Sequence, residues 1–65
     1  MTPEAFRAAR DTLGLTQDQF ATVLGYGHKM RVSEVERGIR EAGPAVVRLV
    51  QAYLDGYRPA DWPKE

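Results

Sequence analysis

The chain has 65 residues, with nine Lys and Arg, nine Asp and Glu, one His and no Cys. This length allows one small domain, and the lack of cysteine excludes disulfides and thiolate metal sites and fits a reducing cytoplasm, where we expect the protein. No apolar run approaches the roughly 18–20 residues of a membrane span, so we expect no membrane partner. A formal net charge of zero argues against an indiscriminate binder of polyanions.

The first predicted helix covers about residues 3–13. Thr2 is a suitable N-cap, and Pro3 is favoured at the first position of a helix. Apolar residues then recur at helical spacing, and Gly14 suits the left-handed position that follows a helix end. These signals agree on both ends of the segment.

A second, shorter helix is predicted over about residues 17–24. Thr16 and Gln19 form a capping-box pattern, in which each side chain binds the backbone N–H of the other residue. Gly25 follows the last apolar residue and supplies the positive φ that a tight turn between helices requires. The segment that follows therefore begins a new element.

A third helix is predicted over about residues 29–37, with Gly38 after its end. Val32 and Val35 form its only inward pair. Two short helices joined by a glycine-containing turn form a helix-turn-helix arrangement. The face opposite the two valines presents Met30, Ser33, Glu34 and Arg37, with Lys29 and Arg31 on the flanks.

Glu36 falls on the side of the third helix that is closer to the core than to solvent. A carboxylate in that position is costly unless it is paired. Arg10 lies next to the apolar stripe of the first helix and is the natural partner. We therefore expect a structural ion pair between Arg10 and Glu36.

The fourth predicted helix covers about residues 44–55, and residues 57–65 are predicted to be an extended tail rich in Pro and Trp. The apolar side chains of this helix span an arc of about 160°, wider than one core contact needs. No strand pattern occurs, so the fold class is all-α, with a domain over 1–56 and a tail over 57–65. The wide stripe and the tail offer three aromatic residues that either pack on their own domain or are candidate dimer contacts: Tyr53, Tyr57 and Trp62.

Charge is unevenly distributed along the chain. Residues 28–40 hold four basic and two acidic side chains, a net charge of +2, while the remainder holds five basic and seven acidic ones, a net charge of −2. An isolated run of charges is usually an ordinary solvated surface. Its position on and after the third helix favours contact with nucleic acid.

Three segments together resemble the Cro/C1-type (XRE) family of helix-turn-helix repressors. They are Leu13-Gly14-Leu15-Thr16-Gln17-Asp18-Gln19-Phe20-Ala21, Leu24-Gly25, and Ser33-Glu34-Val35-Glu36-Arg37-Gly38. The resemblance covers about residues 5–55 and implies a small four-helix, lambda-repressor-like fold. It also implies that Gln17 binds a DNA phosphate, often through its backbone amide, and that Arg10 and Glu36 form a buried ion pair.

The chain departs from the family pattern in two places. Between Gly25 and Glu36 it has one residue more than is usual, which lengthens the turn, and the usual Ser or Thr cap of the third helix is absent. Either Gly27 or His28 must then cap that helix. The tail also takes the place of the family's fifth helix, through which these proteins usually dimerise.

The resemblance implies that the third helix enters the major groove of double-stranded DNA. Glu can accept from cytosine N4 there, and an apolar side chain can meet a thymine methyl group; the alternative is that Glu34 and Met30 merely lie beside the DNA. We expect base contacts from Lys29, Met30, Ser33 and Glu34. We expect phosphate contacts from Gln17, Arg31, Arg37 and Arg40.

The predicted function is a dimeric, sequence-specific regulator of transcription, most simply a repressor that blocks a promoter, which can be its own. The alternative is a protein-interaction module, such as an antitoxin that binds a toxin, or an adaptor. Nothing in the sequence resembles a catalytic constellation, so we expect no enzyme activity, no cofactor and no small-molecule effector. His28 has no second metal ligand nearby, so we expect no metal site.

Overall fold

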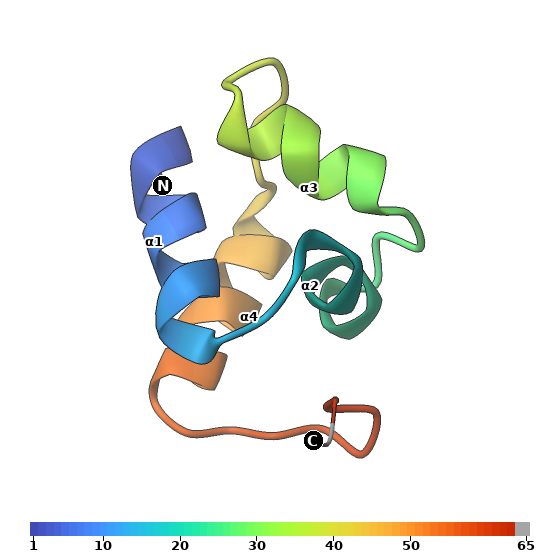
Figure 1. Ribbon diagram of the computed structural model, residues 1–65. Coiled ribbons are helices and arrows are strands. Elements are labelled where there is room, and N and C mark those ends of the chain that lie inside the picture. Colours follow the sequence, from blue (N-terminus) through green and yellow to red (C-terminus); the bar gives the residue numbers. More distant parts are fainter. Residues whose placement is uncertain (64–65) are drawn as a thin grey trace.

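The structure is a computed structural model that describes residues 1–63, and it contains four helices (Figure 1). In chain order they are α1 (Pro3–Leu13), α2 (Gln17–Leu24), α3 (Lys29–Glu36) and α4 (Pro44–Leu54). No strand occurs within these 63 residues. The all-α class and the order of the elements are confirmed.

The first two helices begin where their capping residues predict. The Thr2 hydroxyl accepts from the backbone N–H of Ala5 at 3.0 Å. At the start of α2 the capping box is complete, because Gln19 N donates to the Thr16 hydroxyl at 3.1 Å and Thr16 N donates to Gln19 Oε1 at 3.0 Å. These bonds satisfy backbone donors that the first helical turn leaves without a partner.

The last two helices end one residue earlier than predicted. Arg37 and Asp55 still have right-handed torsion angles, but they are the C-cap residues that follow α3 and α4. After Arg37 the chain reverses at Gly38, whose φ is +77°. The N–H of Gly38 then donates to Val35 O and that of Ile39 to Glu34 O, which is the bonding pattern of a Schellman motif.

One core is shared by all four helices. The rings of Phe6 in α1 and Phe20 in α2 lie 5.0 Å apart, centroid to centroid, and both side chains are fully buried. From α3 the buried residues are Val32 and Val35. The rest of the buried core consists of Ala9, Leu15, Ala21, Val23, Leu24, Val50 and Tyr53.

The tail is not simply extended, which corrects the sequence-based expectation. It turns after Pro59, where Trp62 N donates to Pro59 O at 3.1 Å, and Trp62 packs against the core. Its described part lies on the opposite side of the molecule from α3 (Figure 1). The prediction covered residues 57–65, of which Lys64 and Glu65 lie outside the described part of the chain.

Candidate nucleic-acid interface

The turn between α2 and α3 fixes how the two helices meet. Gly25 has a φ of +78°, a conformation that a residue with a side chain rarely adopts. Tyr26 N donates to Ala21 O at 2.9 Å, so the chain folds back over the end of α2. Ala21 itself is buried, which is consistent with the close approach that its small side chain allows.

His28 is the cap of α3. Its extended backbone precedes the helix, and its Nδ1 accepts from the N–H of Met30 at 3.0 Å. This resolves the choice between Gly27 and His28 and fixes the start of α3 at Lys29. The imidazole Nδ1 takes the place of the hydroxyl or carboxylate oxygen that usually caps a helix.

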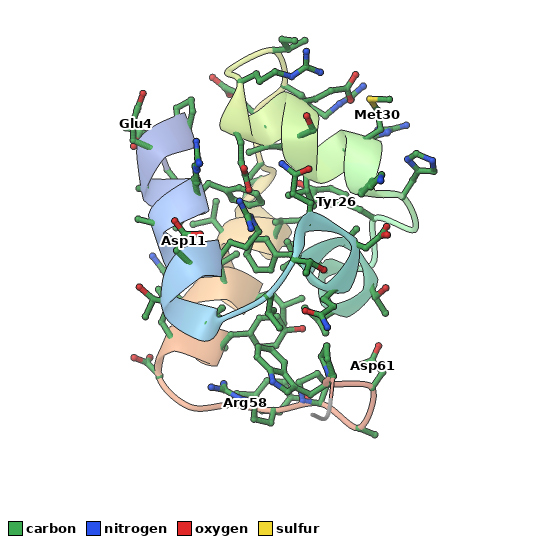
Figure 2. The ribbon with its side chains drawn as sticks, viewed as in Figure 1. Glu4, Asp11, Tyr26, Met30, Arg58 and Asp61 are labelled. Carbon is green, nitrogen blue, oxygen red and sulfur yellow. The ribbon has the colours of Figure 1, made fainter. Side chains whose placement is uncertain are left out.

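The two sides of α3 differ sharply in exposure. Val32 and Val35 are 0% and 3% exposed, whereas Met30 is 52% exposed and its side chain points away from the body of the molecule (Figure 2). Lys29 is also exposed, and Ser33 and Glu34 are half-buried. The four residues predicted to contact bases therefore all have surface that solvent can reach.

Glu36 lies at the junction of the first three helices. Arg10 binds it with two hydrogen bonds, from Nε to Oε2 at 2.6 Å and from Nη2 to Oε1 at 3.2 Å. The side chains are only 14% and 7% exposed, so the predicted ion pair is present and largely buried. The pKa of Arg10 is raised, mainly because Arg10 donates these hydrogen bonds to Glu36.

Two further contacts at this junction were not anticipated from the sequence. Gln17 donates from Nε2 to Glu36 Oε1 at 3.2 Å, and Arg10 Nη1 donates to Leu15 O at 3.0 Å. Glu36 thus connects α1, the start of α2 and the end of α3. Because the side chain of Gln17 is used inside the protein, its backbone amide in the first turn of α2 is the group that remains for a phosphate.

Of the basic side chains predicted to contact phosphate, Arg31 and Arg37 are exposed. Arg40 is also exposed but has a partner, because its Nε donates to Glu34 Oε1 at 3.2 Å. Sequence reasoning missed this pair, since residues six positions apart are not neighbours on a helix. The reversal of the chain at Gly38 is what brings them together.

Tyr26, in the turn before α3, lies close enough to Arg31 and Arg40 for their charges to affect its pKa. Burial raises the pKa of Tyr26, and the positive charges of Arg40 and Arg31 partly oppose that rise. Figure 2 shows Tyr26 between α2 and α3. Arg31 and Arg40 therefore lie near the turn between α2 and α3.

Tyr53, for which the sequence left both a core role and a dimer contact open, lies in the core. It is 1% exposed, and its hydroxyl donates to the carbonyl oxygen of Val23 in α2, so it belongs to the core. Trp62 is half-buried, and its ring meets that of Tyr53 in a T-shaped arrangement with the ring centroids 5.0 Å apart. Of these three aromatic residues, Tyr57 is the one that presents a large apolar surface to solvent, being 55% exposed and stacked on Tyr53.

The part of the chain that the structure describes holds no group of three or more His, Cys, Asp or Glu residues placed to bind a metal ion. Within residues 1–63, none of the helices has the length and apolar character needed to cross a membrane.

Two short helices joined by a tight turn, the second with a buried apolar side and an exposed polar side, define a helix-turn-helix domain. The model of a helix-turn-helix family matches residues 6–62, most of the chain. The chain therefore belongs to this family, the XRE family of Cro/C1-type, DNA-binding transcription regulators. No curated protein and no solved structure matched in the corresponding comparisons.

Proposed function

We propose that this protein is a cytoplasmic, sequence-specific repressor that binds double-stranded DNA as a homodimer. In this proposal α3 lies in the major groove and blocks access to a promoter, which can be that of its own gene. Bases are read by Lys29, Met30, Ser33 and Glu34. Phosphates are bound by the Gln17 amide and by Arg31, Arg37 and Arg40.

The observation that carries this proposal is the two-sided character of α3. Val32 and Val35 anchor the helix in the core, and Met30 extends 52% exposed from the other side. The net charge of +2 over residues 28–40 lies on and directly after this helix. A helix held in this way can place side chains against base edges while nearby cations bind the backbone on either side.

The homodimer follows from the small size of the domain. One short recognition helix offers few base and phosphate contacts, whereas two copies double them. Paired copies would bind half-sites about 34 Å apart, or a multiple of that distance. With about six to eight phosphate contacts in total, the logarithm of the binding constant should fall against the logarithm of salt concentration with a slope near −5 to −7.

The test begins with selection of duplexes from a random library at moderate salt. We expect one preferred sequence with two related halves, and sedimentation should show two copies on each duplex. The double substitution Lys29→Glu with Arg40→Glu should abolish binding. The matched control reverses two exposed arginines outside residues 28–40, Arg7→Glu with Arg48→Glu, and should retain the preference. Recovery of random sequence by the wild type would refute the proposed function.

A second candidate function is binding to a protein partner, such as the toxin of a toxin–antitoxin pair, or an adaptor role. It is favoured by the exposure of Leu54 and Tyr57 at the end of α4, which are 44% and 55% exposed. This end of α4 leads into the tail, which lies at the opposite end of the molecule from α3 (Figure 1). The two functions therefore use separate surfaces.

The charge reversal at Lys29 and Arg40 distinguishes these candidates. If the end of α4 binds a protein, that variant should lose DNA and keep the partner, while Leu54→Ser with Tyr57→Ser should do the opposite. Sedimentation of the wild type without DNA shows whether the partner is a second copy of the chain. Loss of both activities in the charge-reversal variant would contradict separate surfaces.

A further inference from the structure

The negative charge of Glu34 is unfavourable on a surface proposed to bind DNA. Its carboxylate lies on the outer side of α3, among the residues proposed to face the bases. A free carboxylate there is repelled by the phosphates on both sides of the groove. Within a major groove, however, a correctly oriented carboxylate accepts a hydrogen bond from cytosine N4. The side chain is useful only if its charge is balanced and its direction is fixed.

Arg40 balances the charge of the Glu34 carboxylate and fixes its direction through a single nitrogen, Nε. Its Nε donates to Glu34 Oε1 at 3.2 Å, and the two side chains are 45% and 24% exposed. Because only Nε is used in this bond, the donors on the two Nη groups at the end of the guanidinium remain available for other partners. Oε2 of Glu34 has no hydrogen-bond partner within residues 1–63 and can accept from a base.

The backbone holds the two residues in this arrangement. The carbonyl oxygen of Glu34 accepts from Ile39 N at 2.9 Å and from Arg40 N at 3.3 Å. Glu34 is therefore bound to the following loop through both its main chain and its side chain. The loop can adopt this path because Gly38 has a φ of +77°. Arg40 is thus held beside Glu34 before any DNA is present.

We propose that Arg40 is a positioning residue for base recognition, and that the Glu34–Arg40 pair selects a cytosine in the operator. This inference rests on the proposed function and adds a second role to Arg40 beyond phosphate binding. Nε orients the carboxylate of Glu34 and balances its charge, while the Nη groups bind the DNA backbone. Removal of Arg40 then changes which base is preferred, whereas removal of a simple phosphate contact weakens all sequences equally.

The experiment uses the duplex that the wild type selects and, at each position, its three alternatives. The variant Glu34→Ala identifies the base pair that Glu34 reads, because at that position the variant no longer discriminates between bases. The wild type should prefer cytosine there by about 5- to 100-fold. Arg40→Met, which removes every donor but keeps an apolar stem of similar length, should reduce that preference by about threefold or more.

Arg37→Met is the matched control. Arg37 is an exposed arginine at the end of α3, three residues before Arg40, and it has no ion pair within the described residues. This variant should weaken binding to all four duplexes by the same factor and leave the ratios of their binding constants unchanged. In the double variant Glu34→Ala with Arg40→Met, the ratio should equal that of Glu34→Ala alone. Circular dichroism of each variant verifies that the four helices are retained.

Three results would overturn the inference. The first is a Glu34→Ala variant whose base preferences all equal those of the wild type. The second is an Arg40→Met variant that binds all four duplexes more weakly by the same factor. The third is a preferred base other than cytosine at the position that Glu34 reads. Each of these leaves a sequence-specific DNA-binding repressor, although the first removes Glu34 from the residues proposed to read bases. Failure of the wild type to select any sequence contradicts the proposed function itself, so the two failures are distinguishable.

Discussion

Glu36 is the residue on which the arrangement of the helices most depends. It accepts hydrogen bonds from Arg10 in α1 and from Gln17 at the start of α2. Its side chain is 7% exposed, so water replaces these donors poorly if one is removed. The same contacts determine where the first turn of α2 lies relative to the end of α3. The stability of the domain and the placement of a phosphate contact are therefore coupled at this carboxylate.

Glu36→Ala should lower the free energy of unfolding by about 3–5 kcal/mol, because it leaves the Arg10 guanidinium largely buried without its partner. Glu34→Ala is the control: it removes a carboxylate from the same helix, but from the more exposed pair with Arg40, and should cost about 0–1 kcal/mol. Urea denaturation of the two variants measures both values. Equal losses would show that burial does not distinguish the two pairs.

Tyr53 makes stability depend on alkaline pH. Burial is the main cause that raises its pKa, with smaller effects in the same direction from Asp61 and Tyr57. The folded state therefore favours the neutral phenol. The corresponding stabilisation is fully present below the unfolded-state pKa of about 10 and is lost as pH rises through the higher folded-state pKa.

The free energy of unfolding of the wild type should accordingly fall between about pH 9 and pH 11. Tyr53→Phe should make this fall smaller, although it also removes the hydrogen bond to Val23 O, which should cost about 1 kcal/mol at neutral pH. Tyr57→Phe, at an exposed position, is the control and should retain most of the fall of the wild type, because Tyr57 has only a smaller effect on the pKa of Tyr53. An identical pH dependence in the Tyr53 and Tyr57 variants would contradict this assignment.

At the scale of a single element, α3 is the helix most dependent on its cap. It has eight residues, fewer than an isolated helix needs to be stable in water. Its only inward anchors are two valines. The hydrogen bond from Met30 N to the imidazole of His28 satisfies one of the N–H groups in its first turn. The recognition helix therefore begins at a definite residue although the usual hydroxyl cap is absent.

His28→Ala should lower the free energy of unfolding by about 1 kcal/mol, since it removes this acceptor. His28→Asn restores a good cap and should recover most of the loss. Thermal unfolding followed by circular dichroism, together with amide exchange at Met30, measures the change in the protein and at the cap itself. A Met30 amide that exchanges equally fast in the wild type and in His28→Ala would exclude the proposed capping role.

For the molecule as a whole, the tail closes the end of the core opposite α3. Trp62 contacts Tyr53 edge to face, and the guanidinium carbon of Arg58 lies 4.2 Å from the centre of the Trp62 ring. Arg58 also donates to Tyr53 O at 2.8 Å. Through the Tyr53 hydroxyl, this cluster connects the tail to α2. The chain thus covers part of its own core with a short segment that is not helical.

Trp62→Ala should destabilise the fold by about 1–3 kcal/mol, because a half-buried aromatic surface and its contact with Tyr53 are lost. Trp62→Phe should recover part of this through the same edge-to-face packing. Leu54→Ala, at an exposed apolar position, is the control and should cost little. Chemical denaturation monitored by circular dichroism compares the three variants. A stability equal to that of the wild type in Trp62→Ala would show that the tail does not contribute to the core.

The sequence alone determined the local structure and one long-range pair. Capping residues, proline and glycine fix helix ends through bonds within a few residues, so all four helices were placed to within one residue at their ends. The side of a helix on which a residue lies also follows from its spacing, which was sufficient to pair Arg10 with Glu36. These features depend on short-range geometry and on the cost of burying an unpaired charge.

The tertiary structure decided the rest. Only the path of the chain after Gly38 brings Arg40 to Glu34, and only the packing of α4 on α2 buries Tyr53 rather than leaving it for a partner. An apolar stripe shows that a surface must be covered, but its periodicity does not say by which segment. The balanced charge of the chain follows the same rule. Its sum and the excess of +2 over residues 28–40 follow from the sequence, whereas folding determines that Arg40 pairs with Glu34 and that Arg31 and Arg40 lie near Tyr26.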